Sequence, residues 1–386
     1  MNTIELDQSY IAHTYKRFPL EIVSGKGSVV QDASGKEYID MGSGIAVTSF
    51  GVSDDIWIAA VEEQIRQVQH MSNLYYTAPC ALLAESLCTR TGMSRVFFGN
   101  SGAEANECAI KVARKWAAEN RGPNCNLIVT LENSFHGRTL TTLAATGQEH
   151  YHELFQPLTP GFVHIPAGNI DALRSYCADG KVAAVLIECI QGEGGVIPLD
   201  PVFVSNLEEY LKEQGILLMI DEVQTGNGRT GKLYAYMNYG LHPDVVTTAK
   251  GLAGGLPLGA CIMGDRVKDV LSYGDHGSTF GGNPVACAAA LSVMNRLTDT
   301  FLSEVEAKSV LLRELLEGAP GIISVSGLGL MLGLKTAKSA PEVVAACMEG
   351  GVLCLTAKDK VRLLPALNIP EKLLRKAAGI IKAACV

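Results

Sequence analysis

The fold is decided by the stretch Val245-Val246-Thr247-Thr248-Ala249-Lys250-Gly251-Leu252-Ala253-Gly254-Gly255. Its short run of β-branched residues favours a β-strand, and the glycines that follow favour a turn. Lys250 is therefore predicted at the C-terminal end of a buried strand. Burial of a lysine at such a position is energetically unfavourable, because its ammonium loses hydration there, and this suggests a functional role.

A second apolar run, Gly215 to Ile220, is followed by the acidic residues of Asp221-Glu222-Val223-Gln224. Asp221 lies 29 residues before Lys250. Ligands of open parallel sheets bind at the carboxyl ends of the strands, so we expect Lys250 and Asp221 to share one site. An amine beside a carboxylate is what pyridoxal phosphate chemistry requires. The amine attaches the cofactor, and the anion keeps its ring nitrogen protonated.

Both residues also have a purely structural interpretation. Lys250 could be a surface lysine that follows a strand, and Asp221 a turn residue at a strand end. The glycines after Lys250, however, leave room for a cofactor. A carboxylate after an apolar run needs a partner, and a protonated ring nitrogen provides one.

The region from about 95 to 265 contains seven strand candidates. Their continuous apolar character indicates strands buried on both faces, in a mostly parallel sheet with helices on either side. We therefore predict an α/β fold with a large domain over 56–284 and a smaller α+β domain assembled from 1–55 and 285–386. The seven candidates are 95–98, 127–131, 162–165, 182–188, 216–221, 245–248 and 260–263.

A candidate phosphate site follows the first of these strands. Ser101 and Glu104 have the S-x-x-E spacing of a capping box, at the start of a helix predicted over 103–119. Gly102 lets backbone N–H groups approach an anion, and a helix N-terminus favours negative charge. Ser101, Gly102 and Ala103 could thus hold the phosphate. The alternative is a well-capped helix without a ligand.

Composition excludes several classes of function. The net charge of −8, with only 32 scattered Lys and Arg residues, argues against binding to nucleic acid or anionic membranes. The eleven cysteines form no C-x-x-C pair, so we expect free thiols in a reducing compartment. The first twenty residues resemble neither a signal peptide nor a transit peptide. We expect a cytoplasmic enzyme.

Other motifs are weaker. Gly226-Asn227-Gly228-Arg229-Thr230-Gly231 satisfies the dinucleotide pattern G-x-G-x-x-G, but it begins too far beyond its strand and opens no obvious helix. No zinc motif and no G-x-S-x-G elbow occurs, so we predict neither a metal site nor a serine hydrolase. His136 is left without a catalytic role.

The chain resembles the class III, fold type I aminotransferases from about residue 15 to 375, because six motifs occur in the order typical of that family. The family's enzymes use pyridoxal 5′-phosphate. The motifs are 100–107, Phe135-His136-Gly137-Arg138, 188–195, 221–226, Thr248-Ala249-Lys250-Gly251 and 276–284.

This resemblance implies roles in cofactor binding. Lys250 would be the Schiff-base lysine and proton shuttle, Asp221 the partner of the ring nitrogen, and Gln224 a partner of the ring hydroxyl. Phe135 and Val223 would lie on the two faces of the ring. The phosphate would be bound by Ser101, Gly102 and Ala103, with Thr279 from the partner subunit of a homodimer that shares its active sites.

It also implies roles in substrate binding. Arg138 would hold the α-carboxylate, and Arg362 the second carboxylate of 2-oxoglutarate. Glu193 would shield Arg362 while the amino donor is bound, and Ser278 would also line the substrate site. A structural ion pair is the alternative for Arg362.

Within the family, several segments resemble the acetylornithine aminotransferases. They imply transfer of the terminal amine of N-acetylornithine to 2-oxoglutarate, in arginine biosynthesis. The same chemistry on ornithine, succinylornithine, succinyl-diaminopimelate or a γ-amino acid such as GABA stays open, because these substrates differ far from the reacting amine. A catalytically dead cofactor-binding protein and a mutase are further alternatives. The segments are 14–19, 44–47, 72–76 and 361–365.

Overall fold

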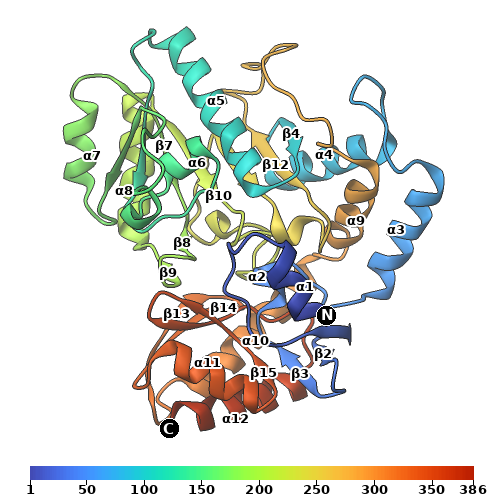
Figure 1. Cartoon of the computed structure of the whole chain (residues 1–386). Coiled ribbons are helices and arrows are strands. Elements are labelled where there is room, and N and C mark those ends of the chain that lie inside the picture. The colour runs from blue at the N-terminus through green and yellow to red at the C-terminus, as the bar shows by residue number, and fades with distance from the viewer.

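The computed structural model describes residues 1–386 and contains a central seven-stranded sheet (Figure 1). Strand β12 runs antiparallel to β11 and β4, and all other pairs are parallel. This confirms the predicted mostly parallel sheet, with strand ends within about one residue of those predicted. In spatial order the strands are β4 (Arg95–Gly99), β12 (Gly259–Met263), β11 (Val245–Thr248), β10 (Leu217–Asp221), β7 (Val182–Ile187), β5 (Leu127–Leu131) and β6 (Phe162–Ile165).

Both faces of this sheet are covered by helices. Successive residues of β10 illustrate this: Leu217 and Met219 belong to the core that also contains Trp116 of α5 (Gly102–Asn120). Leu218 and Ile220 belong to the core of α8 (Pro201–Gln214). Because side chains alternate across a strand, burial on both faces explains why the strand has no polar residues until Asp221.

The two ends of the chain meet in a smaller sheet. Strand β15 (Val352–Leu353) pairs in parallel with β3 (Glu37–Asp40). On its other side β3 pairs antiparallel with β2 (Val29–Asp32), which in turn pairs antiparallel with β1 (Ile22–Lys26). Figure 1 shows these blue strands beside the orange and red C-terminal elements. The sheet thus joins both chain ends, while the exact domain limits stay a prediction.

The C-terminal part adds a four-stranded sheet that carries Arg362. Its order is β13 (Ile322–Leu328), β14 (Met331–Thr336), β17 (Lys360–Leu363) and β16 (Leu355–Ala357). Three helices belong to the same part: α10 (Asp299–Leu316), α11 (Ala340–Glu349) and α12 (Glu371–Cys385).

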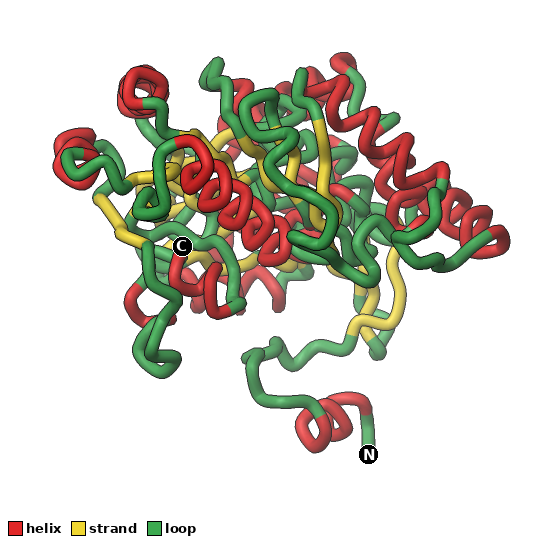
Figure 2. Tube along the Cα trace, turned by 90° about the horizontal axis from the view of Figure 1, so that it is seen from above, coloured by secondary structure: helices red, strands yellow, loops and turns green.

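The remaining elements connect these parts. Helices α3 and α4 pack against α9. The N-terminal helix α1 buries none of its residues, and Figure 2 shows it standing away from the rest of the chain. None of the helices combines the length and apolar composition needed to cross a bilayer. The remaining bounds are α1 (Thr3–Tyr10), α2 (Ser43–Ala46), α3 (Asp55–Gln67), α4 (Ala78–Thr91), α6 (Leu140–Ala145), α7 (Ile170–Cys177), α9 (Pro284–Met294), β8 (Ile190–Gln191) and β9 (Ile197–Pro198).

Candidate active site

A cavity of about 470 Å³ lies where strands β10 and β11 end and helix α5 begins. The parallel direction of β10 and β11 places their carboxyl ends at the same edge of the sheet. Nine of the predicted site residues line this cavity: Ser101, Gly102, Ala103, Phe135, Arg138, Asp221, Val223, Gln224 and Lys250.

Lys250 enters the cavity directly after β11. Its backbone has φ +45°, in the left-handed region that non-glycine residues rarely adopt. Burial lowers the pKa of its amine, and the positive charge of Arg362 acts in the same direction, whereas the carboxylates of Glu193 and Asp221 oppose the shift. A lowered pKa makes an amine nucleophilic near neutral pH.

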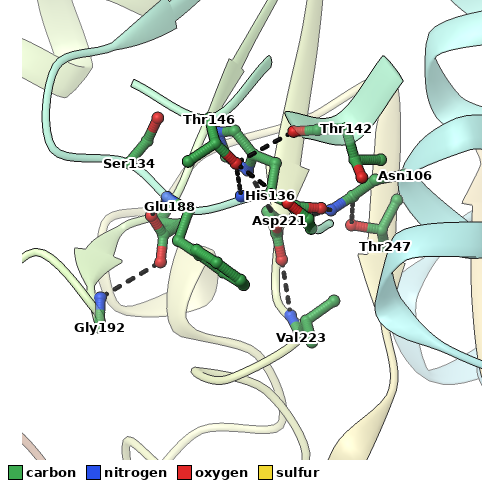
Figure 3. A network of polar contacts seen from close by, with 12 residues as sticks. Asn106, Ser134, His136, Thr142, Thr146, Glu188, Gly192, Asp221, Val223 and Thr247 are labelled. Carbon is green, nitrogen blue, oxygen red and sulfur yellow. Dashed lines mark hydrogen bonds and ion pairs between the residues drawn. The ribbon is translucent and has the colours of Figure 1, made fainter. Parts of the chain in front are cut away.

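Asp221 ends β10 and is held by three hydrogen-bond donors (Figure 3). Its Oδ2 accepts from Asn106 Nδ2 at 2.7 Å and from His136 Nδ1 at 2.9 Å, and its Oδ1 accepts from the Val223 backbone N–H at 2.9 Å. Three donors from three different segments hold the carboxylate in one orientation. The Asp221 side chain is therefore fixed at the wall of the cavity.

The start of α5 lies on the same wall. Ser101 Oγ accepts from the Glu104 N–H at 3.2 Å, as the predicted capping box requires. The return bond of that box is different: Glu104 Oε2 accepts from the Asn100 N–H at 2.5 Å, and Glu104 Oε1 accepts from Asn100 Nδ2 at 3.1 Å. Ser101 is therefore a simple N-cap. The first N–H groups of α5 remain without intrahelical acceptors.

Gly102 is a glycine for a steric reason. A Cβ atom at this position would lie 2.7 Å from Cγ1 and 2.8 Å from Cγ2 of Val223. Real carbon atoms stay about 3.5 Å or more apart. Because Gly102 and Val223 approach so closely, the start of α5 and the Val223 side chain lie side by side on the cavity wall. Such a wall suits a flat ligand that carries an anionic group.

Arg138 is exposed at the rim of the cavity. Its guanidinium lies 5.0 Å from the centre of the Tyr151 ring and 5.7 Å from that of Phe135. These distances are within the range of cation–π contacts. No carboxylate of the chain forms an ion pair with Arg138. It is available to an anionic ligand.

Arg362 forms a second cationic position behind the cavity. Its buried side chain donates from Nη1 to Glu193 Oε1 at 2.5 Å and to Gln224 Oε1 at 3.0 Å. Burial opposes ionisation of Glu193, but Arg362 holds the pKa of this carboxyl below its ordinary value. Neither Arg362 nor Glu193 lines the cavity itself, and Gln224 lies between them and the open space.

Ser278 and Thr279 do not line the Lys250 cavity. They line a neighbouring hollow of about 590 Å³, in which Thr279 is exposed. Ser278 Oγ accepts from Asn100 Nδ2 and from the Gly281 N–H, both at 3.0 Å. Within one chain, this loop contacts Asn100 at the edge of the Lys250 cavity, but Ser278 and Thr279 do not line that cavity.

Three buried residues of the site received no role from the sequence. His136 and Asn106 both donate to Asp221, and Glu188 accepts from the backbone N–H groups of Phe135 and Gly192 at 3.0 and 3.2 Å. Burial raises the pKa of Glu188 to about 7, and the charge of Asp221 acts in the same direction. His136 and Glu188 do stand in motifs of the family, but nothing local to the sequence distinguishes them from polar residues of an ordinary core.

The G-x-G-x-x-G segment has a structural role. No helix follows it before the 3₁₀ turn Ala235–Asn238. Arg229 is buried and donates to the carbonyl oxygens of Leu330 at 3.0 Å and Pro365 at 2.6 Å. The segment therefore connects the central sheet to the C-terminal part of the chain.

Comparison with known proteins decides the family. The profile described as Aminotransferase class-III matches residues 10–385. The chain belongs to this family. Enzymes of this class use pyridoxal 5′-phosphate, and the chain is accordingly a PLP-dependent aminotransferase.

Individual relatives agree with this assignment. An acetylornithine aminotransferase of Haemophilus ducreyi is 48% identical over 98% of this chain and 96% of its own length. One of Methanocaldococcus jannaschii is 41% identical over 96% and 94%. Among solved structures, an N-acetylornithine aminotransferase from Stenotrophomonas maltophilia has a TM-score of 0.85 at 35% identity, covering 99% of this chain and 98% of that one. An ornithine aminotransferase from Toxoplasma gondii has a TM-score of 0.94 at 33% identity, covering 99% and 93%.

Proposed function

We propose that the chain transfers the terminal amine of N-acetylornithine to 2-oxoglutarate, giving N-acetylglutamate semialdehyde and glutamate, as a step of arginine biosynthesis. The observation that carries this proposal is the near full-length similarity, at 41–48% identity, to acetylornithine aminotransferases of distant organisms. The cavity is consistent with it, because it combines an amine, a fixed carboxylate and a free guanidinium.

The residues of the cavity suit the cofactor. Bound PLP supplies an electron sink that stabilises negative charge on the carbon carrying the amine. Lys250 would attach the cofactor and then take and return the proton of that carbon. Asp221 would hold the ring nitrogen protonated, with Val223 and Phe135 on the two ring faces. Gln224 would bind the ring hydroxyl, and the start of α5 would bind the phosphate through Ser101, Gly102 and Ala103.

Two arginines would distinguish the two substrates. Arg138 would bind the α-carboxylate that both substrates carry, through paired N–H···O bonds. Arg362 would bind the second carboxylate, which only 2-oxoglutarate has. Glu193 already neutralises Arg362 at 2.5 Å, so the site would tolerate an amino donor that lacks this carboxylate. Ser278 lies outside the Lys250 cavity of its own chain, so it would contribute to a substrate site only across a subunit interface.

Ornithine is the second candidate donor, because the fold is also very similar to an ornithine aminotransferase, at a TM-score of 0.94. A single-turnover screen decides between them by following cofactor absorbance after mixing with each diamino acid. We expect the half-reaction with N-acetylornithine to have the higher second-order rate constant. The Lys250→Ala variant should show neither turnover nor the absorbance of the attached cofactor. A preference for free ornithine would contradict the assigned substrate.

We also propose a homodimer in which Thr279 binds the phosphate of the partner's site. Thr279 is exposed and lies outside its own chain's Lys250 cavity. Large apolar side chains are exposed near this loop, including Leu74 at 87% and Tyr76 at 107%, and Asn73 bonds to the loop carbonyls of Ser278 and Gly281. An exposed apolar patch of this kind indicates an interface, and two-fold dimers are the commonest homo-oligomers.

Mixing two inactive variants tests the shared site. A dimer of one Lys250→Ala chain and one Thr279→Val chain has one site with both lesions and one site with neither, if the loop acts across the interface. Activity should then return after subunit exchange. No return of activity, or full activity of a monomer in sedimentation, would contradict the arrangement. The cytoplasmic location stays a prediction that rests on cysteine usage.

A further inference from the structure

Asn106 joins the three elements that form the floor of the active site. It lies on α5 and is 1% exposed, Thr247 lies on β11, and Asp221 ends β10. Asn106 Nδ2 donates to Asp221 Oδ2 at 2.7 Å and to the His136 carbonyl oxygen at 2.8 Å, and Thr247 Oγ1 donates to Asn106 Oδ1 at 2.6 Å (Figure 3). Every polar atom of the Asn106 amide is therefore used.

The surrounding groups allow only one orientation of this amide. If it were turned over, Oδ1 would face the Asp221 carboxylate and the His136 carbonyl, both of which are acceptors. Buried acceptors that face each other are strongly unfavourable. In the observed orientation the two N–H groups meet these two acceptors, and the Thr247 hydroxyl satisfies the oxygen.

This arrangement decides which oxygen of Asp221 remains available. Oδ2 receives both Asn106 and His136, so its two lone pairs are taken, whereas Oδ1 receives only the Val223 N–H. The free lone pair of the carboxylate is therefore on Oδ1. Loss of the Asn106 bond would free Oδ2 and remove the difference between the two oxygens.

Asn106 also lies one helical turn after Gly102, on the helix whose start forms the proposed phosphate site. It thus connects the elements proposed to bind the two ends of the cofactor. We propose that Asn106, oriented by Thr247, is a positioning residue that presents one defined oxygen of Asp221 to the cofactor nitrogen. This inference rests on the proposed role of Asp221 and goes beyond it.

The test measures the ring nitrogen directly. The holoenzyme is loaded with ¹⁵N-labelled PLP, and the ¹⁵N NMR shift reports the fraction of protonated ring nitrogen at a mildly alkaline pH. Thr247→Val removes the orienting hydroxyl with little change of shape and suits a strand. Asn106→Ala removes the donor. Thr247→Ser retains the hydroxyl and should restore the parent signal.

We expect both Thr247→Val and Asn106→Ala to lower the protonated fraction. Asn106→Ala should also weaken PLP binding about tenfold or more, the order expected for a hydrogen bond to a charged group, and Thr247→Val, which removes a bond between neutral groups, should weaken it less. A loss of packing alone would not change the nitrogen shift. If Asp221→Asn changes the shift but Thr247→Val leaves it at the parent value, this inference is wrong and the proposed role of Asp221 stands. If Asp221→Asn also leaves it unchanged, both are wrong.

Discussion

The substitution Gly102→Ala tests the steric design of the cofactor site. The new Cβ would lie 2.7 and 2.8 Å from the two methyl groups of Val223. Because carbon atoms need about 3.5 Å or more, the start of α5 and Val223 must separate by roughly 1 Å. That movement displaces two surfaces proposed to hold the cofactor, the phosphate site and one face of the ring.

The size of the effect follows from the cost of overpacking. An extra carbon in a closely packed site costs about 1–3 kcal/mol. Without the cofactor the two surfaces can move apart, whereas PLP binding requires the parent spacing, so this cost falls on binding and lowers the affinity for PLP by about 5- to 150-fold. The folded chain itself should remain, because alanine is favourable in a helix.

Equilibrium titration with PLP, followed by absorbance of the attached cofactor, measures this affinity. Gly379→Ala is the matched control, since Gly379 lies in α12 and nothing occupies the space around its missing Cβ. The control should bind PLP as the parent does and gain up to ~1 kcal/mol of helix stability. An affinity of Gly102→Ala within twofold of the parent would refute the reasoning.

Other positions give independent tests. Arg362→Ala should slow the 2-oxoglutarate half-reaction about tenfold or more in single-turnover kinetics, while Arg138→Ala harms both halves; equal damage by both variants would contradict the two-arginine scheme. Tyr151→Leu should raise KM for both substrates about 2- to 5-fold by removing a cation–π contact with Arg138, and Tyr151→Phe should not. Burial raises the pKa of Glu222 to about 7, so the folded state retains a proton that the unfolded state loses above about pH 4.5, and stability falls as the pH rises from there to about 7. The free energy of unfolding, measured with urea at pH 5 and pH 8, should fall between these pH values by about 1–3 kcal/mol less in Glu222→Gln than in the parent. An identical pH dependence of the two proteins would exclude a buried proton on Glu222.

The sequence alone predicted the central sheet and the main groups of the cavity. The strands were recognised because burial on both faces leaves a continuous apolar run, which is a local pattern. Lys250 and Asp221 were recognised because each charge ends such a run, and the carboxyl ends of β10 and β11 must meet at one edge of the sheet. The candidate phosphate site at Ser101, Gly102 and Ala103 was recognised because a predicted helix begins there directly after a predicted strand.

Only the tertiary structure decided how the polar groups pair. The partner of Arg362 is Glu193, 169 residues earlier, and Asn106 meets Asp221 across 115 residues. The Glu104 carboxylate accepts from the backbone N–H of Asn100, where a capping box would use that of Ser101, and Thr279 lies outside the Lys250 cavity of its own chain. A hydrogen bond depends on positions within a few tenths of an ångström, which the packing of several elements determines together. Apolar periodicity and strand ends are properties of neighbouring residues, and the sequence displays them directly.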